Sequence, residues 1–270
     1  MKMKRDTKIR AYVLSLLTGI MIILPGKAVY SQIDRQQGGS EVFIDRRNKE
    51  NIAGRAEIAF AIGERFDLPQ NLMWGVVNLK EAMNRWTDVT TDLTQHLMLS
   101  DQRIMNVPFL FVSTDKVFDL SETEKQNLRM YFQNGGFMFL DNAEPRTDFS
   151  ASGAALQKLL RDVIPNVRFA SIPNSHGIYH SYFDFTDGPP QGAEVGLVPT
   201  ATPDIVIRSR DRFYLEGAWY NNELVAVYSD KGYILKWNET SNNEPQLRMG
   251  VNLIVYALTK TNSIAKQTIR

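Results

Sequence analysis

One stretch decides the fold class: VPFLFVSTDKVFDLSETEKQNLRMYFQNGGFMFLD, residues 107–141. It begins with a short, continuously apolar run, which is typical of a strand buried on both faces. Ser121 and Glu124 have the spacing of a capping box, which predicts the start of a helix. Gly135 and Gly136 predict the end of that helix, and residues 137–140 the next buried strand. This alternation predicts an α/β fold: a three-layer α/β/α domain with a mostly parallel sheet.

The rest of the chain extends this alternation in both directions. Apolar residues at spacings of three and four predict helices over residues 52–66, 70–85, 153–163 and 249–258. Further strands are expected over residues 167–172, 205–207 and 223–228, with a hairpin turn at Asn221 and Asn222. Residues 173–200 are rich in proline and glycine and predict a long loop. We expect a single domain over residues 41–262, followed by a polar tail at 263–270.

The N-terminus has the pattern of an export signal. A basic run from Lys2 to Arg10 precedes 14 mostly apolar residues, 11–24. A membrane-spanning helix needs roughly 20 such residues, so the order of these parts indicates a secretory signal peptide. We place the signal peptide at residues 1–31 and a flexible lead-in at 32–40. The expected location is periplasmic or extracellular, and an uncleaved membrane anchor is the alternative.

The composition argues against several classes of function. The leader holds six of the 31 basic residues and one of the 30 acidic ones, so the rest carries 25 and 29. No block of lysine and arginine remains there, which argues against nucleic acid as a partner. The chain contains no cysteine, which excludes disulfides, thiol nucleophiles, iron–sulfur clusters and cysteine-based zinc sites.

Polar residues follow the predicted strands at the point where each strand ends. Ligands of an open parallel sheet bind outside the carboxyl ends of its strands, so these residues are candidates for a ligand site. The ligand-binding candidates are Ser113, Asp115, Asn142, Glu144, Asp184, Ser229 and Asp230. Neither serine has the G-x-S-x-G context of an α/β-hydrolase nucleophile.

Three residues are candidates for catalysis or for a metal: Asp141, His176 and His180. Carboxylates and imidazoles are the groups of acid–base pairs and of metal sites, and the loop with both histidines could fold over the same sheet edge. Two alternatives stay open. Asp141 and Asn142 could form only a turn or a helix cap. His180 lies among aromatic residues and could be a packed, hydrogen-bonded histidine.

Several segments, taken in order, resemble the bacterial domain-of-unknown-function family DUF4159. They include VPFLFV at 107–112, YFQNGGFMFLD at 131–141, HGIYHSYFDF at 176–185 and GVNLIVYALT at 250–259. The resemblance implies a flavodoxin-like or class I glutamine amidotransferase-like fold and no established activity. The amidotransferase reaction needs a cysteine that this chain lacks.

The chain departs from the pattern of this family at three places. Asn142-Ala143-Glu144 stands where family members often carry a second aspartate and cysteines. An acidic–basic pair is replaced at residues 155–157, and a glycine-rich stretch is shortened at 230–232. A family site at these positions would be altered or lost in this chain.

Two hypotheses about function follow. The first is an exported, non-catalytic ligand-binding or assembly module of the cell envelope, with an envelope protein or a small molecule as its partner. The alternative is a hydrolase or metal-dependent enzyme with a site at the carboxyl ends of the strands. The sequence names no cofactor, and membrane contact is expected only through the leader, if it is uncleaved.

Overall fold

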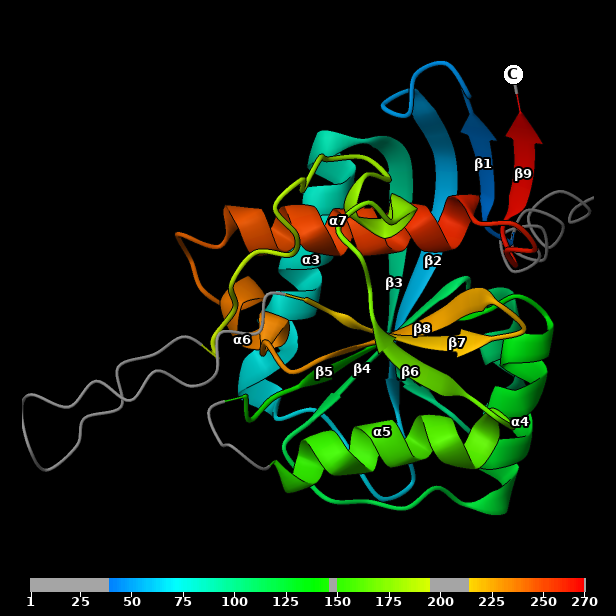
Figure 1. The fold of residues 1–270 in the computed structure, drawn as a ribbon, viewed down its shortest axis with the longest axis vertical. Helices are drawn as coiled ribbons and strands as arrows, with labels where there is room; N and C mark the ends of the chain where they lie inside the picture. Colours follow the sequence, from blue (N-terminus) through cyan, green and yellow to red (C-terminus); the bar gives the residue numbers. More distant parts are fainter. Residues whose placement is uncertain (1–38, 146–149, 195–213, 270) are drawn as a thin grey trace, which may run out of the picture. The chain divides into compact units, whose positions relative to one another are not determined.

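A nine-stranded sheet with helices on both faces organises the chain (Figure 1). The structure, a computed structural model, describes residues 39–145, 150–194 and 214–269. The predicted signal peptide at residues 1–31 and the predicted strand at 205–207 lie outside the described residues. The predicted α/β class is confirmed. None of the described helices is long and apolar enough to cross a membrane.

The sheet is mixed. Its strands are β1 (Glu41–Ile44), β2 (Ile52–Ile62), β3 (Asp88–Met98), β4 (Phe109–Thr114), β5 (Phe137–Asn142), β6 (Arg168–Ser171), β7 (Glu216–Tyr220), β8 (Glu223–Ser229) and β9 (Lys266–Ile269). Their order is β6-β7-β8-β5-β4-β2-β1-β9, and β3 also pairs with β2. Strands β3, β2, β4, β5 and β8 are parallel to their neighbours in that group. Three antiparallel pairs complete the sheet: β7 with β8, β7 with β6, and β1 with β2, where β1 lies on the edge of β2 opposite to β3.

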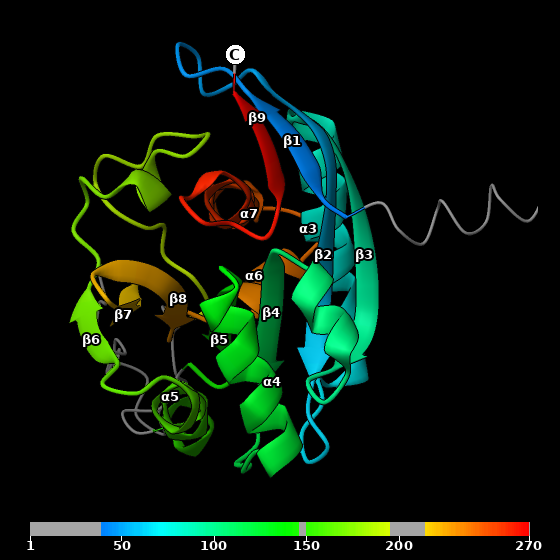
Figure 2. The same ribbon diagram turned by 90° about the vertical axis from the view of Figure 1, so that its right-hand side faces the viewer.

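The helices form two layers, one on each face of the sheet. Helices α3 (Met73–Trp86), α6 (Tyr233–Trp237) and α7 (Glu244–Thr259) pack on one face. Helices α4 (Glu122–Gln133) and α5 (Ala151–Val163) pack on the other (Figures 1 and 2). Short 3-10 helices occupy Gln70–Leu72, Gln102–Asn106 and Gly177–Tyr179.

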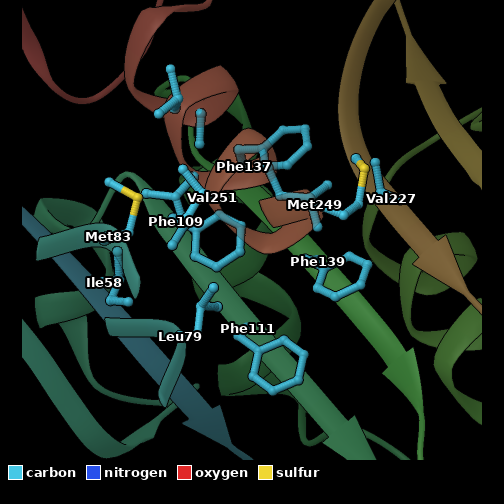
Figure 3. Close-up of a cluster of buried hydrophobic side chains, with 14 of the residues drawn as sticks. Ile58, Leu79, Met83, Phe109, Phe111, Phe137, Phe139, Val227, Met249 and Val251 are labelled. Carbon is cyan, nitrogen blue, oxygen red and sulfur yellow. The ribbon is translucent and has the colours of Figure 1, made fainter. Parts of the chain in front are cut away.

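The two cores arise from the alternation of side chains along the central strands. Phe111 of β4 and Phe139 of β5 face α3 and α7, and their rings stack with centroids 5.6 Å apart (Figure 3). Leu110 and Met138, one residue earlier, face α4 and α5 on the other side. Strands β4 and β5 therefore have apolar residues at consecutive positions, 109–112 and 137–140, as the apolar runs in the sequence predicted.

The structure confirms the helix predicted between these two strands. The Ser121 side chain accepts from the Glu124 amide at 3.4 Å, and the Glu124 carboxylate accepts from the Ser121 amide at 2.7 Å, which completes the capping box. Gly135 ends the turn after the helix at φ 87°. A Cβ at Gly135 would lie 1.5 Å from the carbonyl oxygen of Asn262, so this position requires glycine.

The predicted helix over residues 52–66 is wrong, because this segment forms strand β2. Ile52, Ala56, Ala59 and Phe60 have helical spacing, but they are buried because β2 is a central strand with both faces covered. Gly54 has φ 136°, and a Cβ there would lie 2.2 Å from the Glu41 carbonyl oxygen. Gly54 therefore permits the close approach of β1.

The other predicted elements inside the described residues are present, with shifted ends. Helices α3, α5 and α7 and strands β6 and β8 correspond to them, and α7 begins earlier than predicted, at Glu244. Asn221 and Asn222 have φ 49° and 63°, as a type I′ hairpin turn requires. Strands β1, β3 and β7 and helix α6 were not predicted. The segment expected to be a polar tail contains β9, which pairs with β1.

Candidate functional site

The carboxyl ends of β4, β5 and β8 bring three candidate residues together. Ser113 pairs with Asp141 across β4 and β5, and Asp141 pairs with Ser229 across β5 and β8. The Ser113 hydroxyl donates to the main-chain oxygen of Asp141 at 2.7 Å. All three residues are buried. The sequence predicted this juxtaposition from the strand ends alone.

Asp141 is the most perturbed acid of this cluster. Its Oδ2 accepts from the Ile234 amide of α6 at 2.8 Å, while Oδ1 has no hydrogen-bond partner among the described residues. Burial raises the pKa of Asp141 to about 7, against the opposing effects of the Ile234 amide and the Ser229 hydroxyl, and the charge of Glu194 raises it further. Asp141 therefore changes its protonation state near neutral pH.

A buried ion pair lies beside this carboxylate. The Lys231 ammonium is 2.8 Å from Glu194 Oε1, and the two side chains are only 1% and 3% exposed. Glu194 Oε2 also accepts from the Gly192 amide at 2.7 Å. Sequence reasoning missed this pair. Glu194 lies in the proline- and glycine-rich loop, where an acidic residue is expected to face solvent.

Asn142 organises the turn that follows β5. Its Nδ2 donates to Asp230 Oδ1 at 2.6 Å, and its Oδ1 accepts from the Glu144 amide at 2.9 Å and the Ser152 hydroxyl at 2.8 Å. The Glu144 side chain itself is exposed. Asn142 therefore has the turn-forming role that the sequence left open as an alternative to a ligand-binding role. Nearby, at the end of β4, the half-buried Asp115 has a buried Oδ1 without a partner among the described residues.

His180 is hydrogen-bonded through both ring nitrogens. Nδ1 lies 3.0 Å from Asp184 Oδ1, and Nε2 lies 2.9 Å from the Asn174 carbonyl oxygen. Asp184 also pairs with Lys49 at 2.6 Å, and the hydrogen bond from Lys49, followed by that from His180, lowers the pKa of the exposed Asp184 carboxyl. The alternative of a hydrogen-bonded structural histidine describes His180.

His176 lies elsewhere, against Trp219 and Tyr256, whose ring centroids are 5.4 and 5.6 Å from its own. Trp219 pairs with Leu224 at the start of β8, whereas Asp141 pairs with Ser229, five residues further along that strand. Five residues of strand span roughly 16 Å. The structure therefore does not bring His176 to Asp141. Among the described residues, no group of three histidine, aspartate or glutamate side chains could hold a metal ion.

His176 instead lines a pocket of about 500 Å³ at the amino end of β8. The loop with His176 forms one wall, the β7–β8 hairpin the second, and the end of α7 the third. The titratable and aromatic residues of the lining are His176, Trp219, Glu223, Tyr256 and Lys260. Gly177 also lines the pocket, and a Cβ built on it meets nothing within 4 Å.

Two side chains of this pocket, His176 and Tyr256, carry protons that they can donate to a ligand at pH 7. His176 Nδ1 accepts from the Ile178 amide at 3.2 Å, so the proton of the neutral ring is on Nε2. Burial lowers the pKa of His176 and raises the pKa of Tyr256 to about 12, so the imidazole is neutral and the phenol protonated at pH 7. Burial also lowers the pKa of Lys260, which the charge of Glu223 partly offsets.

Sequence reasoning found only one residue of this pocket, His176. Trp219, Glu223, Tyr256 and Lys260 come from the hairpin and from the end of α7, between 43 and 84 positions further along the chain. No spacing in the sequence links these segments. The fold alone brings them together, because the β7–β8 hairpin and α7 both end at the amino edge of the parallel strands.

No curated protein matches the chain. A family model described as "Domain of unknown function (DUF4159)" matches residues 58–258. The match extends from β2 to α7 and includes the strand-end residues as well as His176, Trp219 and Tyr256. Lys260 lies two positions beyond it. The match covers most of the sequence and agrees with the motifs noted above, so the chain belongs to the DUF4159 family.

Proposed function

We propose that this protein is an exported, non-catalytic ligand-binding module of the cell envelope, and that a small molecule binds in the pocket at the amino end of β8. The observation that carries this proposal is the pocket itself. Its volume of about 500 Å³ falls in the range of small-molecule sites, and it combines aromatic walls with a few polar groups.

The contacts within the pocket support binding rather than catalysis. Nucleophilic catalysis needs a nucleophile hydrogen-bonded to a base that a third group orients. Here the Ser181 hydroxyl donates to the Gly177 carbonyl oxygen at 2.8 Å, and His176 Nδ1 is occupied by a main-chain amide. No carboxylate among the described residues is hydrogen-bonded to His176 or ion-paired with it. The pocket thus offers recognition groups without an activated nucleophile.

A flavodoxin-like arrangement is part of the proposal. Its support is the spatial order β3-β2-β4-β5-β8 of the five parallel strands, which is 2-1-3-4-5 when they are counted along the chain. In such sheets ligands bind where the order reverses, here at the carboxyl ends of β2 and β4. Asp115 stands at the end of β4 with an oxygen that has no partner in the described part of the chain, and Asp141 has a pKa of about 7. These two observations favour a second candidate function, acid–base chemistry at the strand ends.

The proposed location rests on the basic and apolar order of residues 2–24. Fractionation of bacterial cells that produce the full-length chain tests it. Export predicts the protein in the periplasmic or secreted fraction, shortened by about 31 residues. A full-length protein confined to the cytoplasm would contradict this part of the proposal.

Two glycine substitutions test the pocket. Gly177 lines it, Gly39 lies outside it, and a Cβ at either position meets nothing within 4 Å, so both sites tolerate a side chain. A library of small metabolites is screened by ligand-observed NMR against the full chain and the variants Gly177→Phe and Gly39→Phe. We expect ligands that bind the parent and Gly39→Phe and fail on Gly177→Phe. Ligands that bind all three proteins equally would place the site elsewhere, and a folded parent without any ligand would contradict the proposal.

A further inference from the structure

We infer that the ligand of this pocket is a small organic anion, a monocarboxylate that carries a flat apolar ring, and that Lys260 recognises its carboxylate. This inference rests on the proposed function and names the class of ligand.

Lys260 forms no ion pair among the described residues, although the charge of Glu223 acts on it. Its side chain is half-buried, and its ammonium makes one long hydrogen bond, 3.5 Å to the carbonyl oxygen of Thr261. No carboxylate of the described residues lies within ion-pair distance of it. An unpaired lysine ammonium that water solvates costs little free energy. A partly desolvated ammonium is stabilised when a negative charge lies beside it. A ligand carboxylate in the pocket would supply that charge.

Two further donors of the pocket are free to bind the same ligand. The Nε2 proton of His176 and the hydroxyl of Tyr256 have no hydrogen-bond partner within the described part of the chain. Glu223, the one acid among the described lining residues, is exposed and accepts from the Asn262 amide at 3.3 Å. Together with the Lys260 ammonium, the His176 and Tyr256 donors favour an acceptor-rich ligand group, as a carboxylate is. A single ammonium suits one negative charge better than the two of a phosphate.

The walls select the remainder of the ligand. The His176 ring meets the Trp219 ring edge-on at 88° and the Tyr256 ring at 53°, which leaves an aromatic corner beside Lys260. Aromatic corners of this kind bind flat apolar groups through offset or edge-to-face contacts. A ring attached to a carboxylate by a short linker would place the ring in this corner and the charge at Lys260.

The experiment compares a charged probe with its neutral isostere. Phenylacetate and 2-phenylacetamide are titrated into the full-length chain, and into its Lys260→Met, Lys260→Arg and Lys116→Met variants, by ligand-observed NMR. Lys116 is an exposed lysine outside the pocket and serves as the matched control. A charge-assisted hydrogen bond contributes about tenfold in affinity. We expect phenylacetate to bind at least about tenfold more tightly than the amide, Lys260→Met to remove this preference, and Lys260→Arg to retain most of it.

The outcomes separate this inference from the proposed function. Equal binding of both probes, or a preference for phenylacetate that survives in Lys260→Met, would overturn the inference and leave a pocket that binds neutral ligands. Binding of neither probe would overturn it too, while library ligands lost only in Gly177→Phe would still support the pocket. Thermal unfolding of each variant shows whether it is folded. If Lys260→Met is unfolded, the relative affinity of Lys260→Arg for the two probes tests the inference instead.

Discussion

The buried carboxyl of Asp141 makes the stability of the fold depend on pH in a defined way. Its pKa is about 7 in the folded chain, against the ordinary aspartate value of 3.8 in the unfolded chain. Between these values the folded state holds a proton that the unfolded state releases, so the contribution of Asp141 to stability is most favourable at low pH and falls as the pH rises towards 7. With these two pKa values, the contribution of Asp141 falls by roughly 2.5 kcal/mol between pH 5 and pH 8.

Urea unfolding of the parent chain and of Asp141→Asn at pH 5 and pH 8 measures this contribution. The asparagine keeps an oxygen that can accept from the Ile234 amide and has no charge to bury. We expect the parent to lose roughly 2.5 kcal/mol more than Asp141→Asn over this range. Asp187→Asn, at an exposed position, is the control and should follow the parent. Parallel pH profiles for the parent and Asp141→Asn would refute the reasoning.

Three other predictions concern stability and are measured by urea unfolding. Lys231→Met should cost about 3–5 kcal/mol because it leaves Glu194 buried without its partner, and adding Glu194→Gln should recover more than half; no recovery would contradict this account. Gly54→Ala should cost more than about 1 kcal/mol, since φ is 136° and the new methyl group would collide with Glu41; an unchanged midpoint would contradict it. Asn252→Ala should cost about 2–4 kcal/mol, because this buried amide holds the main chain at Phe183 in place, and a loss below 1 kcal/mol would speak against that role.

The sequence predicted the elements whose local signals agree with their tertiary surroundings. The segment from β4 to β5 is the clearest case: apolar runs, a capping box and a glycine stop each specify one element. The prediction failed for β2, because alanine and isoleucine at intervals of four fit a helix as well as a strand covered on both faces. Strand β9 is short and polar, and only its pairing with β1 orders it as a strand.

The candidate site residues were likewise predicted correctly only where a local signal in the sequence agrees with the fold. Asp141, Asn142 and Ser229 were predicted to meet because strand ends of a parallel sheet share one edge, and they do. The loop with His176 was expected to be able to fold over that edge, and nothing local in the sequence shows that this loop instead packs on α7. The side chain of Asn252, in the middle of α7, makes that connection by binding the main chain of Ile178 and Phe183.

Binding of the ligand at the amino end of β8, and not at the strand ends, can be tested by spectroscopy. The chain has four tryptophans, so four indole N–H signals are expected, and Trp→Phe variants assign them. Trp219 lines the pocket, whereas Trp237 belongs to α6, the helix whose Ile234 amide binds Asp141. On addition of phenylacetate, or of any ligand found in the screen, the account predicts that the Trp219 signal moves and the Trp237 signal stays. Movement of Trp237 with Trp219 unchanged would contradict the account and place the site at the strand ends.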